Sequence, residues 1–194
     1  MIATPFFSLQ DEADVFVLRL QSADGTNRLT RECVLALREA LSRISRDGRP
    51  LVISGSSRFF SAGADLEEIA ALDARSAYEF AQMGRELMGS IEQFPATIYA
   101  AVSGYCMGGG LDLAVACHRR IAARNAIFGH RGAALGLITG WGGTQRLPRL
   151  VGKAVALEMF VAAEKVTAHR ALEIGLIDAL ADDPVGEAVR RLSR

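Results

Sequence analysis

The sequence lacks an excess of charge of either sign. Its 22 Lys and Arg residues balance its 22 Asp and Glu residues, so the formal net charge is zero. A protein that binds nucleic acid normally gathers an excess of Lys and Arg on one face, and the sequence shows no such cluster. We therefore expect no nucleic-acid partner.

Cysteine is scarce, and its spacing is uninformative for pairing. The three cysteines, Cys33, Cys106 and Cys117, are odd in number and form no CxxC pair. This pattern is typical of small buried side chains in a reducing compartment. It predicts neither a disulfide framework nor a metal site.

Long uninterrupted hydrophobic runs are also missing. The most apolar stretch, residues 98–113, is broken by Ser103, Gly104, Asp112 and the glycines at 108–110. A lipid-exposed helix would need about 20 mostly apolar residues. The N-terminus shows no basic region ahead of an apolar one. We expect a cytoplasmic protein with no membrane partner.

The residues that are present predict one packed domain over residues 1–194. Half of the residues are hydrophobic, which is ample for a core, and the length suits a single domain. Apolar runs at 15–20, 51–54 and 98–102 predict buried strands, and Thr30 is placed to cap a helix that ends at Asp47-Gly48. We expect a loop at 55–63 and further strands at 120–123 and 176–178. Helices are expected at 76–94, 111–117, 153–162 and 168–174, together with a short helix that begins at Asp65 and one that begins at Gly142 and is limited by Pro148. This alternation predicts an α/β fold with mostly parallel strands.

Two loops that leave buried strands carry most of the functional information. They read RFFSAGADL over residues 58–66 and SGYCMGGGLDL over residues 103–113. Each places small residues where a strand turns into a helix, so a substrate can approach backbone N–H groups that the helix leaves unpaired. Two such N–H groups aimed at one point form an oxyanion hole, often worth about 3 kcal/mol for each donor.

Other functions of glycine-rich loops fit less well. A lone glycine cluster after a strand is more often a tight turn than a site. The spacing of Gly104 from the glycines at 108–110 does not match a dinucleotide fingerprint. Gly152-Lys153-Ala154 lacks the hydroxyl group of a phosphate loop, and no G-x-S-x-G elbow is present.

Four blocks occur in order along the chain. They are FFSAGADL from residue 59, AAVSGYCMGGGLDLAVAC from residue 100, FGHRGAALGLITGWGGTQRLPRLVG from residue 128 and AHRALEIGLID from residue 168. Together they resemble the crotonase superfamily, the enoyl-CoA hydratase/isomerase family, over about residues 15–178. The resemblance implies a spiral of ββα turns with surrounding helices, and an acyl-CoA thioester as substrate. Coenzyme A would arrive as part of that substrate, so we expect no separate cofactor.

The resemblance also implies site residues. On matching positions, the N–H groups of Ala64 and Gly109 hold the thioester oxygen. Arg58 stands where family members often carry a cation that binds phosphate, although by itself it is typical of a solvated surface residue. The residues that match the family's adenine pocket are Ala62, Asp65 and Leu66.

The acid–base positions depart from the family pattern. Hydratases of the family use two glutamates; the first position here is Asp112, and the second falls on Gly132, which has no carboxyl group. His130 is a candidate substitute because imidazole exchanges protons near neutral pH, but a lone histidine is more often structural. Asp112 itself has a structural alternative, complementing a helix dipole. Trp141 is expected to pack in the core or to line the acyl pocket.

We therefore expect an acyl-CoA enzyme that stabilises a thioester enolate but is a poor hydratase. The alternative is a non-catalytic acyl-CoA-binding or scaffold protein, which the absence of the second carboxylate favours. A serine peptidase on the same architecture would need a His near Ser103, and none is suitably placed. Family members continue past residue 178 with helices that build a trimer, whereas residues 185–192 predict one short helix here. We expect a homo-oligomer that is either trimer-based or altered in its assembly.

Overall fold

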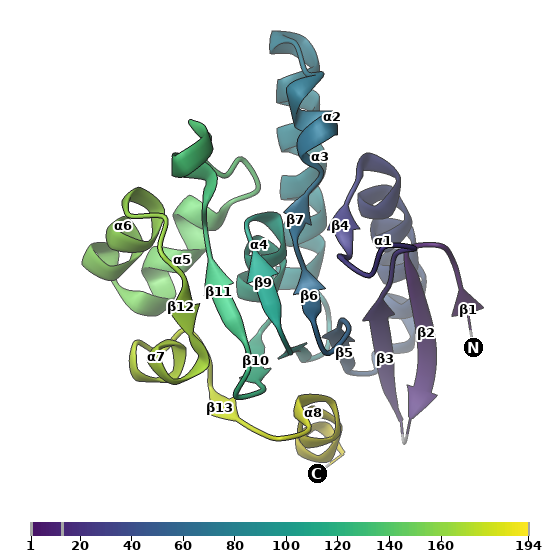
Figure 1. Cartoon of the computed structure of the whole chain (residues 1–194). Helices are drawn as coiled ribbons and strands as arrows, with labels where there is room; N and C mark the ends of the chain where they lie inside the picture. The colour runs from purple at the N-terminus through teal and green to yellow at the C-terminus, as the bar shows by residue number, and fades with distance from the viewer. Residues whose placement is uncertain (1, 13, 194) are drawn as a thin grey trace.

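The computed structural model describes residues 2–12 and 14–193, and its strands form three sheets (Figure 1). The largest sheet has the order β1 (Ile2–Ala3), β2 (Phe7–Glu12), β3 (Val15–Leu20), β5 (Leu51–Ser54), β8 (Ile98–Val102), β10 (Arg119–Ala122), β13 (Ala179–Leu180). The second sheet has the order β12 (Val166–Thr167), β11 (Ile127–Gly129), β9 (Tyr105–Met107), β6 (Phe59–Ser61), and the third pairs β4 (Arg28–Leu29) with β7 (Gly63–Ala64). Seven of the described pairings are parallel and three are antiparallel, which confirms an α/β fold with mostly parallel strands.

The chain visits the two larger sheets in turn. It passes from β5 to β6, from β8 to β9 and from β10 to β11, and each pair of strands is followed by helical structure. The helices are α1 (Arg31–Ile44), α2 (Leu66–Ala70), α3 (Ala74–Glu92), α4 (Gly109–Ala116), α5 (Gly143–Val151), α6 (Lys153–Val161), α7 (Ala168–Glu173) and α8 (Pro184–Leu192), with short 3-10 helices η1 (Ser45–Asp47) and η2 (Gly132–Leu135). The result is a spiral of ββα turns, as expected.

Local sequence signals fix the helix starts. The Thr30 hydroxyl accepts the Cys33 N–H at the start of α1, and Asp73 and Ser76 form a reciprocal capping box at the start of α3. The capping box begins α3 two residues earlier than the expected start at residue 76. None of the helices in the described ranges is both long enough and apolar enough to cross a membrane.

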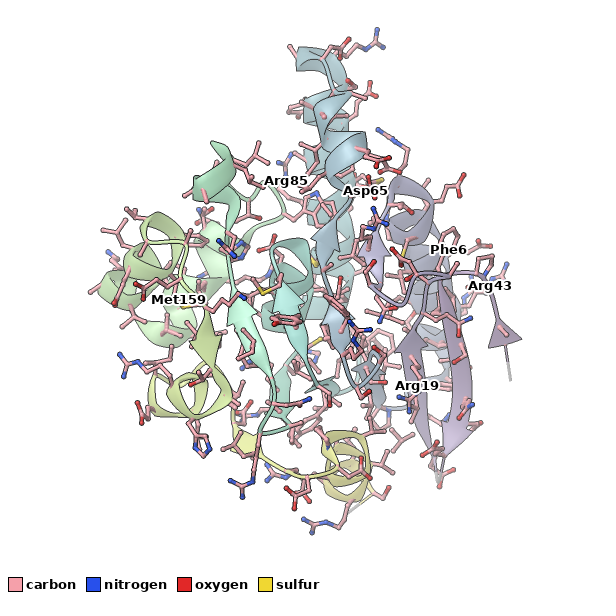
Figure 2. The ribbon with its side chains drawn as sticks, viewed as in Figure 1. Phe6, Arg19, Arg43, Asp65, Arg85 and Met159 are labelled. Carbon is pink, nitrogen blue, oxygen red and sulfur yellow. The ribbon has the colours of Figure 1, made fainter. Side chains whose placement is uncertain are left out.

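Apolar side chains fill both faces of the large sheet. On β3, Leu18 and Leu20 face a core cluster shared with α1, α3 and α4, whereas Val15 and Val17 face a smaller cluster that α8 covers. Alternation along a strand accounts for this division. Figure 2 shows the side chains; Arg43 lies on the surface, and Met159 of α6 is buried.

Three expectations about elements were wrong. The segment 55–63 is not a plain loop, because it contains β6 and the start of β7. Helix α5 continues through Pro148 to Val151, since the ring removes one hydrogen bond while buried Leu147 and Val151 hold the helix against the core. The last strand pairs at Ala179 and Leu180 rather than at residues 176–178.

Candidate active site

The two glycine-containing loops meet backbone to backbone. One runs from β6 through β7, and the other runs from β9 into α4. A Cβ atom on Gly63 would lie 2.6 Å from the Met107 carbonyl oxygen and 3.0 Å from the Gly109 nitrogen, so only glycine permits this approach. A Cβ atom on Gly109 would lie 3.2 Å from the Ala64 nitrogen. The structure therefore brings the backbone nitrogens of Ala64 and Gly109 into one place.

The Gly109 N–H is positioned to bind a ligand. Gly109 is the first residue of α4, and the first N–H groups of a helix have no partner within it. The preceding residue, Gly108, has its N–H bonded to the Gly129 carbonyl at 2.9 Å, which fixes the loop against β11. Two backbone nitrogens gathered in one place are compatible with an oxyanion hole.

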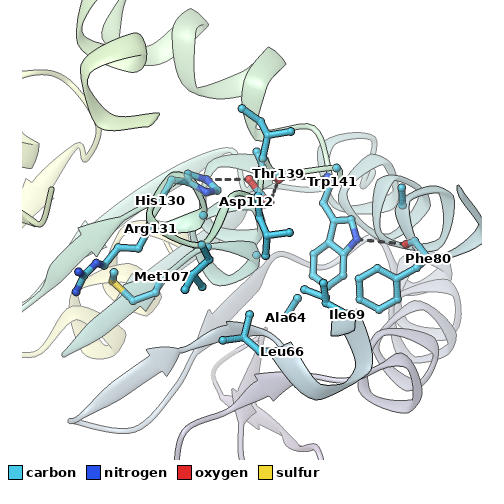
Figure 3. Close-up of a pocket in the computed structure, with 18 of the residues that line it drawn as sticks. Ala64, Leu66, Ile69, Phe80, Met107, Asp112, His130, Arg131, Thr139 and Trp141 are labelled. Atoms are coloured by element: carbon cyan, nitrogen blue, oxygen red, sulfur yellow. Dashed lines mark hydrogen bonds and ion pairs between the residues drawn. The ribbon is translucent and has the colours of Figure 1, made fainter. Parts of the chain in front are cut away.

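A cavity of about 440 Å³ opens beside these loops (Figure 3). Most of its lining is apolar and comes from α2, α3 and the segment around η2. It is lined by Ala62, Ala64, Leu66, Ile69, Leu72, Ala77, Phe80, Ala81, Met107, Gly108, Gly109, Asp112, His130, Arg131, Gly132, Leu135, Leu137, Ile138, Thr139, Gly140 and Trp141. Seven of the nine site residues expected from the sequence thus lie along one cavity: Ala62, Ala64, Leu66, Gly109, Asp112, Gly132 and Trp141.

The other two expected residues, Arg58 and Asp65, do not line the cavity. Arg58 is exposed just before β6, at the end of that strand away from Ala64. Asp65 is buried, and its carboxylate caps α2 by accepting the N–H groups of Glu67 and Glu68. It also forms an ion pair with Arg28 at 3.0 Å. A phosphate contact at Arg58 stays a prediction.

Asp112 lies in the first turn of α4 with its side chain 1% exposed. One carboxylate oxygen, Oδ2, accepts a short hydrogen bond from the Thr139 hydroxyl. The other, Oδ1, lies 3.0 Å from Nε2 of His130. A Cβ atom on Gly143, the first residue of α5, would lie only 2.1 Å from Oδ1. Glycine at position 143 therefore makes room for the carboxylate.

His130 is a functional candidate to which the sequence alone gives little weight. It is buried, lines the cavity and packs its ring on Phe160 of α6, with ring centroids 5.0 Å apart. Its place two residues before the vacant carboxylate position was the signal available in the sequence. Gly132 itself opens η2 and carries no group that exchanges a proton.

Trp141 is held between α3 and α4. Its indole N–H donates to the Phe80 carbonyl at 3.2 Å, and the two rings lie 5.3 Å apart (Figure 3). A Cβ atom on Gly84 would lie 2.2 Å from the indole, and one on Gly109 would lie 2.6 Å from it. Trp141 therefore both packs in the core and lines the cavity, so the two expectations for it are compatible.

Cys106 is not a nucleophile candidate. It is fully buried on β9, and burial raises the pKa of its thiol well above the usual range. A thiol that stays protonated is a weak nucleophile. The remaining candidates for chemistry in the cavity are Asp112, His130 and the backbone N–H groups of Ala64 and Gly109.

Comparisons with known proteins agree with this geometry. Residues 10–193 match the family model described as "Enoyl-CoA hydratase/isomerase". A probable enoyl-CoA hydratase of Bacillus subtilis is 43% identical over 179 residues, covering 91% of this chain and 69% of the relative. A crotonyl-CoA hydratase of Syntrophomonas wolfei is 38% identical over 173 residues, covering 88% of this chain and 66% of the relative. The chain thus spans about two thirds of the length of these curated relatives.

Solved structures of the same kind of protein also resemble this chain. DspI of Pseudomonas aeruginosa superposes with a TM-score of 0.93 at 34% identity, covering 100% of this chain and 75% of that one. An enoyl-CoA hydratase from Bacillus anthracis superposes with a TM-score of 0.90 at 32% identity, covering 96% and 74%. The match of sequence and fold extends over nearly all of the described residues. This chain belongs to the enoyl-CoA hydratase/isomerase family.

Proposed function

We propose that this protein is an acyl-CoA enzyme that stabilises a thioester enolate between the N–H groups of Ala64 and Gly109. The observation that carries the proposal is the close approach of these two backbone segments at an apolar cavity that contains a buried carboxylate. Membership of a family that acts on acyl-CoA thioesters supports the same substrate class. Coenzyme A is part of the substrate in this proposal.

The chemistry suits a thioester. Its carbonyl receives little resonance donation from sulfur, so the α-carbon loses a proton more readily than that of an ester. The negative charge then moves to the carbonyl oxygen, where two N–H donors can hold it. The apolar side chains of Leu66, Ile69 and Phe80 provide a surface for the acyl chain, and the large coenzyme supplies binding energy for positioning.

Asp112 and His130 lie 3.0 Å apart and so make up a single proton-transfer centre, which suits a reaction that needs only one such centre. Among the described residues that line the cavity, Asp112 carries the only carboxylate, and Gly132 contributes none. Hydration requires a base for water and an acid for the α-carbon, whereas double-bond isomerisation can use one group that removes and returns a proton. We therefore expect isomerisation or another one-base reaction, with weak hydration.

The rival function is an acyl-CoA-binding protein without chemistry, which the glycine at position 132 favours. Three probes separate the two: hexanoyl-CoA for binding, crotonyl-CoA for hydration and trans-3-hexenoyl-CoA for isomerisation. Calorimetry should detect binding of hexanoyl-CoA but not of hexanoate. Isomerisation of trans-3-hexenoyl-CoA should exceed hydration of crotonyl-CoA, and D112N should lower it by about 10²–10⁴-fold.

Each result has a defined meaning. Hydration of crotonyl-CoA at about 10–10³ s⁻¹ would contradict a one-base reaction. Tight binding of hexanoyl-CoA, no turnover of either enoyl-CoA and identical binding by D112N would establish the binding protein instead. The exposed residue His169 offers a control, since H169Q should behave as wild type.

A further inference from the structure

Two buried polar atoms in the cavity are neighbours without an aligned hydrogen bond. Oδ1 of Asp112 and Nε2 of His130 lie 3.0 Å apart, yet both are among the buried side-chain atoms without a hydrogen bond in the described residues. Buried polar groups are normally satisfied, and exceptions gather at functional sites. The pair is therefore a candidate for a chemical role.

Strand register brings these two residues together. The parallel pairing of β9 with β11 sets Met107 opposite Gly129, and the Gly108 N–H bonds to the Gly129 carbonyl. His130 follows Gly129, while Asp112 lies one helical turn beyond Gly108. The backbone thus sets His130 and Asp112 next to each other, within reach of their short side chains.

The carboxylate of Asp112 is enclosed rather than presented to a substrate. Oδ2 is occupied by the Thr139 hydroxyl, and Oδ1 is buried against His130 and the start of α5 at Gly143. Asp112 is 1% exposed as a result. In this arrangement it can orient a neighbour and balance its charge, but it does not face a substrate carbon.

The imidazole does have a free nitrogen. Among the described residues Nδ1 of His130 makes no hydrogen bond, and the buried atoms without a partner include Nε2 but not Nδ1. Nδ1 is therefore the ring nitrogen that solvent can reach, on a side chain that lines the cavity. The ring of Phe160 packs on the imidazole and limits its rotation (Figure 3 shows His130 and Asp112).

We propose that His130 is the catalytic base, that it exchanges the proton with the substrate through Nδ1, and that Asp112 is its positioning residue. This inference rests on the proposed function. The lone pair of Nδ1 takes a proton from a substrate carbon, the C–H electrons move into the thioester, and Ala64 and Gly109 hold the enolate oxygen. The imidazolium then returns the same proton to another carbon of the dienolate, and the thioester carbonyl re-forms. No other reactant is consumed.

Asp112 is suited to the supporting role. A carboxylate at Nε2 favours the tautomer that carries hydrogen there, which leaves Nδ1 unprotonated, and it stabilises the imidazolium that forms. A pair that served stability alone would be expected to align its hydrogen bond. Catalytic hydrogen bonds are often poorly aligned without substrate and tighten when it binds.

The test compares H130A and H130Q with the exposed-histidine control H169Q and with D112N. The assays are isomerisation of trans-3-hexenoyl-CoA and exchange of the α-protons of hexanoyl-CoA in deuterated water. We expect kcat of H130A and H130Q to fall by about 10²–10⁴-fold while KM changes by less than about threefold. Binding of hexanoyl-CoA should persist, and H169Q should match wild type.

Rescue distinguishes chemistry from packing. Added 4-methylimidazole should restore activity to H130A and not to D112N, and the rescue should grow with pH as the free-base fraction of the additive grows. Should H130A fail to fold, H130Q carries the test, with thermal unfolding and hexanoyl-CoA binding as checks.

Two outcomes would overturn the assignment. One is retained activity in H130Q together with loss in D112N, which would assign proton exchange to Asp112 and leave the proposed function intact. The other is an H130A protein that folds and binds hexanoyl-CoA, is inactive and is not rescued. By contrast, a wild-type protein that binds hexanoyl-CoA but neither isomerises nor exchanges protons would contradict the proposed function itself.

Discussion

Replacing Gly143 by Ala should disable the site by displacing the carboxylate of Asp112 and crowding the imidazole of His130. The added Cβ atom would lie 2.1 Å from Oδ1 of Asp112, 2.8 Å from Cγ2 of Thr139 and 3.1 Å from Nε2 of His130. The carboxylate must retreat by about 1.3 Å to reach ordinary van der Waals contact. The backbone itself is not strained, because Gly143 is the first residue of α5 and alanine is a good helix former.

The expected magnitudes follow from this displacement. A misplacement of about 1 Å costs on the order of 10²-fold in rate. Overpacking should reduce the free energy of unfolding by about 1–3 kcal/mol, which leaves a folded protein. The assay is kcat for trans-3-hexenoyl-CoA, with urea unfolding to measure stability and hexanoyl-CoA binding to show that the cavity persists.

A matched control is available in α3. A Cβ atom on Gly89 would meet nothing within 4 Å, so G89A should retain full activity and gain up to about 1 kcal/mol of stability. If G143A kept wild-type kcat, the position of Asp112 would be irrelevant to the reaction. The reasoning that links Asp112 and His130 to catalysis would then be refuted.

Three further predictions concern the cavity wall, the surface and the thiols. W141F should lower the free energy of unfolding by about 1–3 kcal/mol, because the indole hydrogen bond and part of the packing are lost. It should also raise kcat/KM for 3-decenoyl-CoA relative to 3-hexenoyl-CoA, because the smaller ring widens the cavity beside Gly109. An unchanged ratio of the two kcat/KM values would show that Trp141 does not line the acyl site. Light scattering should show self-association, since Ile138, Leu157 and Val161 are 71%, 63% and 69% exposed, and a strict monomer would contradict this. Burial raises the pKa of both Cys33 and Cys117 to about 12, so iodoacetamide at pH 8 should label neither in the native protein and both in urea, as mass spectrometry would show.

The long apolar elements could be predicted because their signals are local. Strands β5 and β8 are continuous apolar runs, and the start of α1 is set by the capping hydroxyl of Thr30. Strands β6, β7 and β9 are two or three residues long in glycine-containing segments, so no alternation marks them. Their pairing depends on neighbours distant in sequence.

The candidate site, too, could be predicted only in part from the sequence. The close approach of the two loops could be predicted because small residues between a strand and a helix let backbone segments come near each other. The pairing of His130 with Asp112 could not, since the two are 18 positions apart and meet only through the register of β9 and β11. Likewise, the sequence predicts Asp65 at the start of α2, but nothing in it shows that the carboxylate also pairs with Arg28.

Helix α6 contacts the candidate site with one side chain and exposes two apolar side chains at the surface. Phe160 of this helix packs on His130, while Leu157, about one turn earlier, and Val161, the next residue, are exposed to solvent. A molecule that covered these two side chains would contact the helix that carries Phe160. We therefore expect association with another molecule at α6 to change the orientation of the imidazole, because Phe160 is the contact between this helix and the His130 ring.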